Sequence, residues 1–385
     1  MRLIIAGGGT GGHLFPGIAI AEEFKGRDAV NEVLFVGTEK GIEARVLPKL
    51  GWSLRFISAE GIKGKGVLAR IRAVLKLVPG FFESIKIIKA FKPEVVIGVG
   101  GYASAPLLLA ARFSGIRTAV HEQNALPGLT NRMLGKVVDR VFVTFPDSAS
   151  FFPEGKVVVS GNPLRKEIVE GLKESVVSTL KGIKDQYPKG HKGSEGKKPT
   201  ILIFGGSAGA HRLNMAILEM IGQINDPDRW KIIHQTGEKD YKEVKEGYIK
   251  ADWQADVRPF IYDMASVYSD ADLIICRAGA TTVAELAAAG KPAILIPYPF
   301  AADDHQRVNA ESLVKAGGAM MLLEKELTGE RLATEVERLM GDIEVLKKMG
   351  DRARKLARLD AAKVVVDGVY DLIKSRGGVT PPLQE

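Results

Sequence analysis

A chain of 385 residues, with 45% hydrophobic and 26% charged side chains, is too long for one ordinary core and too apolar for a disordered protein. Its single cysteine, Cys276, excludes an intramolecular disulfide framework, and no apolar stretch reaches the ~20 residues that cross a bilayer. The formal net charge of +8 at pH 7 favours an anionic partner: a phosphorylated ligand, an acidic lipid surface or nucleic acid.

Short apolar runs that end at glycine clusters recur through the first half of the chain. They alternate with segments whose apolar residues have helical spacing, and this alternation predicts βα units with a parallel sheet. The N-terminus enters the first run directly, so we expect no signal peptide. The predicted strands are Leu3–Ala6, Val33–Val36, Val95–Val99, Ala119–Val120 and Val141–Thr144.

A segment rich in Lys, Gly, Asp and Pro, at 180–200, predicts a solvated connection, and a second series of strands follows it. We therefore expect an N-terminal Rossmann-like domain over 1–162 and a C-terminal one over 163–350. Terminal helices and a tail over 351–385 are expected to return to the N-terminal domain. The second series of strands is Thr200–Phe204, Trp230–His234, Val257–Phe260, Leu273–Cys276 and Ala293–Pro297.

The first glycine-rich turn, Gly7–His13, lies between a strand and a helix. Its glycines let the backbone approach a charged group, and the helix start offers N–H groups and a positive dipole end. The same spacing matches a dinucleotide site in which Glu39 would bind the ribose. Similar turns at 98–104, 205–209 and 277–282 make that alternative less favoured, because all four belong at the carboxyl edges of two sheets.

Glu285 lies one turn into a helix that Thr281 and Thr282 are expected to begin. Helical side chains lean toward the N-terminus, so its carboxylate is predicted to accept hydrogen bonds from the vicinal diol of a ribose. The alternative is a carboxylate that only favours the helix dipole. Asp270 and Asp272 precede a strand, which places them at the wrong sheet edge for a nucleotide-bound cation. The six histidines lack metal-ligand spacing, so we expect no metal and no cofactor.

Seven motifs occur in order: Gly8–Gly17, Gly98–Ser104, His121–Asn124, Gly161–Arg165, Gly205–Ala210, Cys276–Glu285 and Asp304–Asn309. Together they resemble the MurG family of N-acetylglucosaminyltransferases of bacterial peptidoglycan synthesis, over nearly the whole chain. The resemblance implies the GT-B fold, in which two Rossmann-like α/β domains with parallel sheets face a central cleft. It also implies inverting transfer of N-acetylglucosamine from UDP-N-acetylglucosamine to the muramoyl 4-hydroxyl of undecaprenyl-pyrophosphoryl-MurNAc-pentapeptide.

The resemblance further implies which residues bind each substrate. Glu285 matches the ribose-binding acid, whereas His305 stands where the family often has a glutamine. The other implied donor-site residues are Asn124, Arg165, Ser207, Phe260, Ile261, Met264, Ala280, Thr281, Thr282, Gln306 and Asn309. The implied acceptor- and phosphate-binding residues are Thr10, Gly11, Gly12, Gly100, Gly101, Tyr102 and Asn124.

Inversion in one displacement requires a base on the acceptor hydroxyl and stabilisation of the departing UDP. Arg165 and Ser207 are the residues expected to stabilise UDP. His13 is the favoured base, because the ordinary histidine pKa of about 6.5 is close to working pH and a glycine turn exposes the side chain. Helix capping or phosphate contact is the alternative role for His13. Glu122 is the second candidate base.

Residues 67–89 interleave cations with large apolar side chains. This pattern predicts a surface that binds an anionic membrane, and the resemblance places it at the cytoplasmic face, peripherally. Pro79 and Gly80 are expected to interrupt the helix, so that four apolar side chains project from the surface: Leu75, Leu77, Phe81 and Phe82. The alternative is an amphipathic helix whose apolar face packs on the sheet.

Other functions remain open from the sequence. A UDP-sugar transferase with another lipid acceptor would share the donor site, and UDP-N-acetylglucosamine 2-epimerase would share the architecture. A non-enzymatic membrane scaffold would leave the glycine turns unexplained. Nucleic acid is disfavoured because the basic residues accompany no aromatic stacking platform. Proteins of cell-wall synthesis are the expected protein partners.

Overall fold

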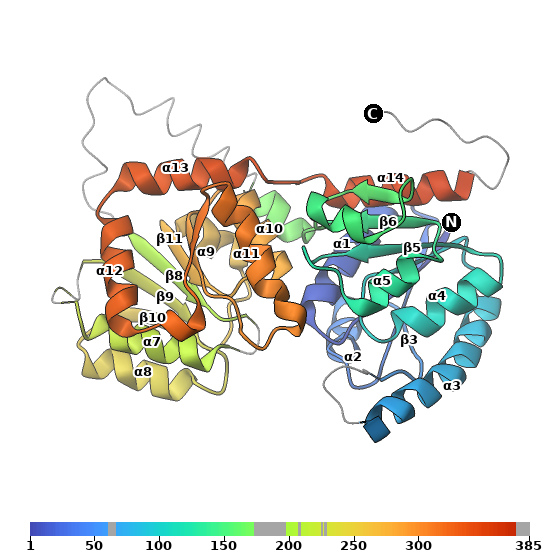
Figure 1. The fold of residues 1–385 in the computed structure, drawn as a ribbon, viewed down its shortest axis with the longest axis horizontal. Helices are drawn as coiled ribbons and strands as arrows, with labels where there is room; N and C mark the ends of the chain where they lie inside the picture. Colours follow the sequence, from blue (N-terminus) through green and yellow to red (C-terminus); the bar gives the residue numbers. More distant parts are fainter. Residues whose placement is uncertain (61–66, 173–197, 207–208, 225, 227–228, 375–385) are drawn as a thin grey trace. The chain divides into compact units, whose positions relative to one another are not determined.

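The chain forms two compact units in a computed structural model that describes residues 1–60, 67–172, 198–206, 209–224, 226 and 229–374 (Figure 1). Unit 1 comprises Met1–Arg165 and Arg358–Glu385, and unit 2 comprises Lys166–Ala357. Each unit contains one parallel sheet with helices on both faces. Among the described residues, no helix is long and apolar enough to span a bilayer.

The sheet of unit 1 has seven parallel strands in the order β3-β2-β1-β4-β5-β6-β7. Its central strands are almost completely buried, as expected for strands covered by helices on both faces. All five predicted strands are present, and two short edge strands were not predicted. The strands are β1 (Arg2–Ala6), β2 (Glu32–Gly37), β3 (Leu54–Phe56), β4 (Val95–Gly98), β5 (Arg117–Glu122), β6 (Arg140–Val143) and β7 (Val157–Val159).

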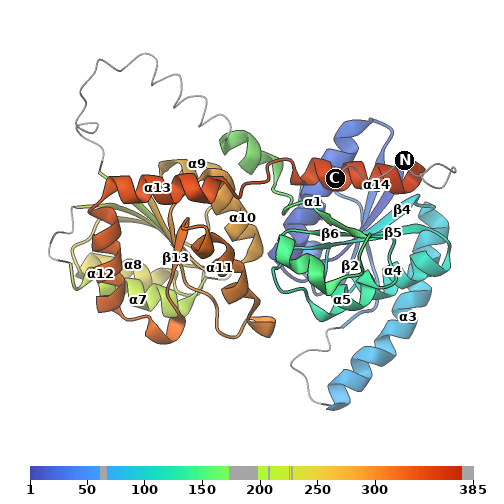
Figure 2. The same cartoon turned by 45° about the horizontal axis from the view of Figure 1, so that its top comes forward.

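The last helix of the chain belongs to unit 1, where it packs beside the first helix (Figure 2). Arg27 forms an ion pair with Asp367 at 2.9 Å, and Asn31 Nδ2 donates to Tyr370 Oη at 2.8 Å. The helices of unit 1 are α1 (Gly11–Arg27), α2 (Glu43–Val46), α3 (Val67–Phe91), α4 (Ser104–Phe113), α5 (Leu129–Gly135) and α14 (Ala361–Lys374), with 3-10 helices η1 (Pro48–Leu50) and η2 (Pro146–Phe151).

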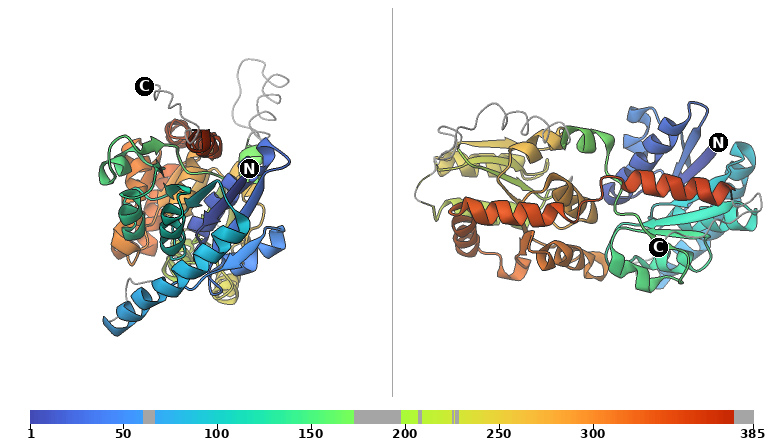
Figure 3. Two further views of the ribbon diagram at one scale, coloured as in Figure 1. Left: turned by 90° about the vertical axis from the view of Figure 1, so that its right-hand side faces the viewer. Right: turned by 90° about the horizontal axis from the view of Figure 1, so that it is seen from above.

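Helix α3 runs without interruption through Pro79, so the predicted break at Pro79 and Gly80 is wrong. The glycine is needed for packing, because a Cβ at Gly80 would collide with the carbonyl oxygen of Ser58. Ser58 is held there by Glu83, whose Oε1 accepts from Ser58 Oγ at 3.0 Å. The Val67 end of α3 extends past the other elements of unit 1 (Figure 3).

The sheet of unit 2 has six parallel strands in the order β10-β9-β8-β11-β12-β13. The strands are β8 (Thr200–Phe204), β9 (Lys231–Gln235), β10 (Ala255–Arg258), β11 (Leu273–Cys276), β12 (Ala293–Leu295) and β13 (Ala319–Met321), the last of which was not predicted. The helices are α7 (His211–Ile221), α8 (Tyr241–Lys250), α9 (Met264–Asp270), α10 (Ala280–Ala289), α11 (His305–Lys315), α12 (Gly329–Met340) and α13 (Ile343–Arg354), with 3-10 helices η3 (Ala302–Asp304) and η4 (Glu324–Glu326).

Both sheets reverse their winding direction at one point, between β1 and β4 in unit 1 and between β8 and β11 in unit 2. Open α/β sheets bind ligands at such switch points, outside the carboxyl ends of the strands. The four predicted glycine turns follow these four strands. The topology of each unit therefore gathers its glycine turns at a single edge.

Candidate active site

In unit 1, the turns after β1 and β4 pack directly against each other. A Cβ at Gly7 would lie 2.7 Å from the carbonyl oxygen of Gly100, and one at Gly101 would lie 2.5 Å from that of Gly8. Gly101 also has a φ of +83°, which favours glycine. These contacts leave Thr10 exposed at the N-terminus of α1. The glycines of unit 1 are therefore needed for close contact between the backbones of the two turns, in addition to the predicted approach of a ligand to the backbone.

A buried carboxylate occupies the inner side of the first turn. Glu43 is almost fully buried. Its Oε2 accepts from Gly9 N at 2.7 Å, and its Oε1 accepts from Thr38 N at 2.9 Å. The Gly9 N–H that a dinucleotide phosphate would need is therefore taken by the protein itself, and Glu39 is an exposed side chain. This geometry argues against the dinucleotide alternative.

His13 is positioned by both turns and by the strand end beside them. Its ring packs against Gly100, where a Cβ would lie 2.6 Å from Nδ1. Nδ1 lies 3.0 Å from Oε1 of Gln123, which follows β5. Thr10 is the N-cap of α1, and His13 takes part there only through its backbone N–H, which donates to Thr10 O at 3.3 Å. The ring is therefore partly exposed and held by a neutral partner, which suits a base better than a cap.

Glu122 is unsuited to be a base in this structure. It is 1% exposed, and each of its oxygens accepts two hydrogen bonds. Oε1 accepts from the backbone and side chain of Asn124, whereas Oε2 accepts from Gly128 N and Asn131 Nδ2. The carboxylate orders the loop after β5, and this structural role favours His13 over Glu122 as the candidate base.

The remaining unit 1 residues surround this edge. Tyr102 is half-exposed on the turn after β4, and Asn124 is partly exposed, with its Nδ2 3.1 Å from Glu122 Oε1. The Arg165 guanidinium lies 4.6 Å from the ring centroid of Phe15, on α1. Arg165, which was assigned to the donor, therefore belongs to unit 1, whereas the other donor residues except Asn124 lie in unit 2.

In unit 2, Glu285 lies one turn into α10, which begins at Ala280 with Gly279 as its N-cap. The predicted start at Thr281 and Thr282 is therefore one residue too late. Glu285 is only 7% exposed, and its Oε2 accepts a hydrogen bond from Tyr268 Oη at 2.9 Å. Glu285 therefore also belongs to the polar part of the core, a role that was not predicted from the sequence.

Two α11 residues organise the loops that follow β11 and β12. Gln306 Oε1 accepts from Ala278 N at 3.2 Å and from Tyr298 N at 3.0 Å. Asn309 is fully buried, and its Nδ2 donates to Ala278 O at 3.4 Å. His305 Nδ1 lies 2.6 Å from the carbonyl oxygen of Ala302, within its own turn. Asn309 therefore shapes the glycine turn from beneath, whereas Gln306 is partly exposed at the edge.

Gln235 joins two further loops of unit 2, although it belongs to no motif that would have selected it. Its Nε2 donates to Gly206 O at 3.0 Å, and its Oε1 accepts from Ile261 N at 2.9 Å. Ile261 is buried, whereas Phe260 is exposed. Met264, the first residue of α9, and Thr281 and Thr282 of α10 are partly exposed. Ser207, a predicted diphosphate contact, lies outside the described residues.

The comparisons with known proteins cover both units. The glycosyltransferase family 28 N-terminal domain matches residues 3–143, and the glycosyltransferase family 28 C-terminal domain matches residues 200–365. A transferase from Geotalea daltonii is 53% identical, over 95% of this chain and 96% of the relative. A transferase from Citrifermentans bemidjiense is 54% identical, over 96% of this chain and 99% of the relative. Both are named UDP-N-acetylglucosamine–N-acetylmuramyl-(pentapeptide) pyrophosphoryl-undecaprenol N-acetylglucosamine transferase. The chain belongs to the MurG family.

Solved structures agree with this assignment. The crystal structure of Acinetobacter baumannii MurG superposes with a TM-score of 0.76 at 33% identity, over 96% of this chain and 99% of that one. A UDP-N-acetylglucosamine 2-epimerase superposes with a TM-score of 0.65 at 14% identity, over 100% of this chain and 99% of that one, which shows a shared fold alone. The fold class is therefore GT-B, with two parallel-sheet α/β domains.

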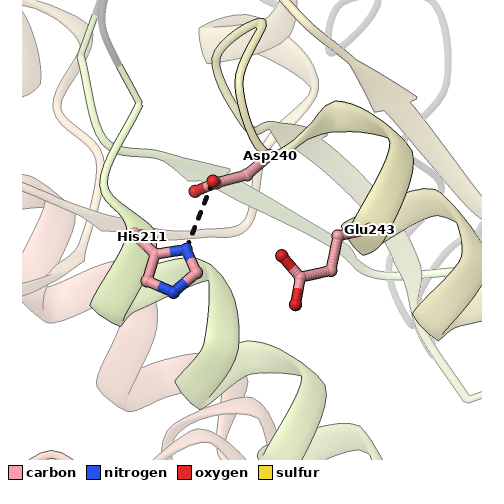
Figure 4. A group of neighbouring side chains, drawn as sticks. All are labelled: His211, Asp240 and Glu243. Carbon is pink, nitrogen blue, oxygen red and sulfur yellow. Dashed lines mark ion pairs between the residues drawn. The ribbon is translucent and has the colours of Figure 1, made fainter.

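This MurG family member also contains a cluster of possible metal ligands that sequence spacing did not reveal. His211, Asp240 and Glu243 place ligand atoms within 4.8 Å of one another (Figure 4). His211 Nδ1 lies 3.2 Å from Asp240 Oδ1, so an ion pair with protonated His211 accounts for the same contact.

Asp272 lies at the amino end of β11, where its Oδ2 accepts a hydrogen bond from Thr200 N at 2.7 Å, as expected for a structural carboxylate.

Proposed function

We propose that this MurG family member transfers N-acetylglucosamine from UDP-N-acetylglucosamine to the muramoyl 4-hydroxyl of undecaprenyl-pyrophosphoryl-MurNAc-pentapeptide, with inversion. It is a UDP-N-acetylglucosamine-dependent N-acetylglucosaminyltransferase of peptidoglycan synthesis. The observation that carries the proposal is the full-length relationship, at 53% identity, to a transferase whose name states this donor and this acceptor. The site geometry supports it, because unit 1 offers a base and unit 2 offers a nucleotide-type helix start.

The donor is assigned to unit 2. The N-terminus of α10 is the positive end of the helix dipole and suits the diphosphate of UDP. Glu285 is the only carboxylate on α10. We assign it to the ribose, whose two hydroxyl groups would donate hydrogen bonds to its oxygens. Gln306 uses Oε1 for the loop backbone, so its Nε2 is the group that we assign to the sugar.

The acceptor and the base are assigned to unit 1. His13 takes the proton of the muramoyl 4-hydroxyl while that oxygen forms a bond to the anomeric carbon of the donor sugar. The bond between the anomeric carbon and the UDP oxygen breaks, and its electron pair leaves with the diphosphate. The helix start at Ala280, together with Arg165 and Ser207, is assigned to stabilise this growing charge.

We also propose that unit 1 docks on an anionic membrane surface at the cytoplasmic face of the cell membrane. Helices α3 and α4 pack side by side and present an apolar ridge, defined as Val78, Phe82 and Phe113. Phe82 is 59% exposed and Phe113 is 80% exposed, far more than a packed core residue. Exposed cations flank the ridge at Lys86, Lys89 and Arg112. Apolar insertion and attraction to anionic headgroups would act together there.

Phe81 has a different role from the one expected. It is partly buried and packs against the buried cluster beneath α3, with its ring centroid 5.7 Å from that of Phe82 and 5.8 Å from that of Phe113. Phe81 therefore supports the ridge from below. Phe113 lies outside the segment 67–89 that the sequence pattern selected. Its exposed ring occupies the surface position that was expected for Phe81.

The deciding experiment supplies radiolabelled UDP-N-acetylglucosamine and a defined muramoyl-pentapeptide pyrophosphoryl lipid. Label is expected in the lipid product, with a β-linkage formed from the α-linked donor. A parallel reaction without acceptor tests the epimerase alternative, and a reaction with diacylglycerol tests another lipid acceptor. Epimerised donor in the first control, or label in diacylglycerol, would overturn the proposed reaction.

A further inference from the structure

The side chain of Gln123 lies between two histidines and has no role in the transfer described above. It is 1% exposed. Its Nε2 lies 2.9 Å from the Val99 carbonyl oxygen and 3.0 Å from His121 Nδ1, and its Oε1 lies 3.0 Å from His13 Nδ1. One end of this chain of hydrogen bonds has a fixed direction, so the direction of every other bond follows.

The fixed end is the carbonyl oxygen of Gly161, which can only accept. It lies 3.0 Å from His121 Nε2, so that nitrogen carries a hydrogen. Complete burial lowers the pKa of His121 to about 4, and the ring is therefore neutral near pH 7. A neutral ring with hydrogen on Nε2 has its lone pair on Nδ1. Nδ1 of His121 therefore accepts a hydrogen bond.

Gln123 presents its amide nitrogen to His121, because only that end of the amide donates. The second hydrogen of the same nitrogen is directed at the carbonyl oxygen of Val99. A rotated amide would place Oε1 against two acceptors, so these partners determine its orientation. Oε1 consequently faces His13 Nδ1, and Nδ1 carries the hydrogen of that bond.

We propose that Gln123 is a positioning residue that holds neutral His13 in the tautomer with hydrogen on Nδ1, leaving the lone pair on Nε2. The hydrogen bond made by one ring nitrogen decides which nitrogen is basic. Gly100 restrains the ring further, because a Cβ there would lie 2.6 Å from Nδ1. The buried chain from Gly161 to His13 thus selects the basic atom without adding a charge.

This inference rests on the proposed role of His13 as the base. Nε2 accepts the proton of the acceptor hydroxyl as the new glycosidic bond forms and the bond to UDP breaks. The ring then carries hydrogen on both nitrogens, and Nδ1 keeps its hydrogen bond to Gln123 Oε1 throughout. No partner has to rearrange during proton transfer, which is the advantage of preorganisation.

The test uses the full-length protein with ¹⁵N-labelled histidine. Long-range ¹H–¹⁵N spectra distinguish the two ring nitrogens, and the His13 signals are those lost in His13→Ala. In the parent protein at neutral pH we expect hydrogen on Nδ1 and a lone pair on Nε2. Gln123→Met has a similar length but no donor and only a weakly accepting sulfur. We expect it to populate both tautomers and to lower kcat by ~10- to 100-fold, with KM for UDP-N-acetylglucosamine nearly unchanged.

His234 is the internal control, because it is buried in unit 2 with other partners and its signals should not move. A parent spectrum with hydrogen on His13 Nε2 would overturn the inference, and this result does not depend on whether Gln123→Met folds. If His13→Ala loses turnover but Gln123→Met keeps both the tautomer and kcat, only the positioning role fails. If His13→Ala retains turnover, the base assignment fails instead.

Discussion

Tyr268 donates its hydroxyl hydrogen to Oε2 of Glu285 across 2.9 Å, at a site where neither side chain has appreciable exposure. One residue therefore has two functions: its carboxylate satisfies a buried hydroxyl and is also the group assigned to the ribose. Burial together with the nearby Glu285 charge also raises the pKa of the Cys276 thiol above its usual range. A substitution at Glu285 has to separate these effects.

Glu285→Gln should separate them. It keeps an acceptor for Tyr268 but removes the charge that strengthens hydrogen bonds to the ribose, so the donor Kd should rise by ~10-fold or more while Tm stays nearly constant. Glu285→Ala should also lower the free energy of unfolding by about 1–3 kcal/mol, because it leaves the Tyr268 hydroxyl without this acceptor. Calorimetric donor titration and thermal melts measure both. Tyr268→Phe is the control and should bind donor normally; unchanged donor affinity in Glu285→Gln would remove the ribose assignment.

His13→Ala should lower kcat by ~10²- to 10⁴-fold, which is the usual contribution of a general base. The donor KM should change little, because the ring lies in unit 1 and UDP is assigned to unit 2. Steady-state kinetics with each substrate varied in turn measure this split. Lys25→Ala is the matched control, at an exposed position of the same helix α1, and should retain most of the turnover. A loss smaller than roughly tenfold for His13→Ala would restore the phosphate-contact role.

Each unit contains a buried neutral histidine, so both should lose stability in mild acid. Burial lowers the pKa of His121 to about 4 and that of His234 to about 3, from 6.5 in each case. Below pH 6.5 the unfolded chain binds a proton that the folded chain excludes, so this stability is present above 6.5 and is lost as pH falls toward the folded pKa.

Denaturant unfolding at several pH values between 7.5 and 5 measures this loss, which should approach ~1.4 kcal/mol per pH unit for each histidine below its unfolded pKa. In His234→Gln the pH dependence of unit 2 should become shallower. The pH dependence of unit 1, which contains His121 but not His234, is the control and should be unchanged in the same variant. An unaltered slope in His234→Gln would contradict the assignment of a neutral buried ring.

The double variant Phe82→Ser with Phe113→Ser should weaken sedimentation with phosphatidylglycerol vesicles and leave Tm almost unchanged, because both rings are largely exposed. Phe81→Ser is the contrasting variant. It should lower Tm, since its ring packs against the buried cluster beneath α3. Raising the salt concentration should weaken binding of the parent protein. If the double variant and the parent bound vesicles equally, the ridge would not be the membrane-docking surface.

Buried strands were predictable from the sequence, because a central strand of a parallel sheet is a continuous apolar run. β11 was predicted with its observed bounds, and β8 likewise. The edge strands β3, β7 and β13 have only three residues each, with partly exposed patterns, so no apolar run marks them. The alternation of strands and helices also predicted that both sheets are parallel, whereas the order of the strands was not predicted.

Candidate site residues could be selected from the sequence where a motif follows a strand, as for His13 and Glu285, and their roles stay predictions. Gln123 was not singled out, because its importance depends on His13, a residue 110 positions away in the sequence. Glu43 lies 34 positions from Gly9 and belongs to no motif. The helix break predicted at Pro79 was wrong, because proline usually breaks a helix but α3 continues through this one. Contacts between distant segments decided the cases of Gln123 and Glu43.

The packing of α14 on α1 has a consequence for the order of events at the ribosome. The core of unit 1 includes Val365, Val366, Val369 and Leu372, which are synthesised after every residue of unit 2. Nascent unit 1 therefore emerges with a gap in its hydrophobic core, while unit 2 is complete in sequence as soon as Ala357 has left the tunnel. The domain made first is the one that finishes folding last, and a chain that stops before Ala361 would leave Phe24 and Phe142 uncovered.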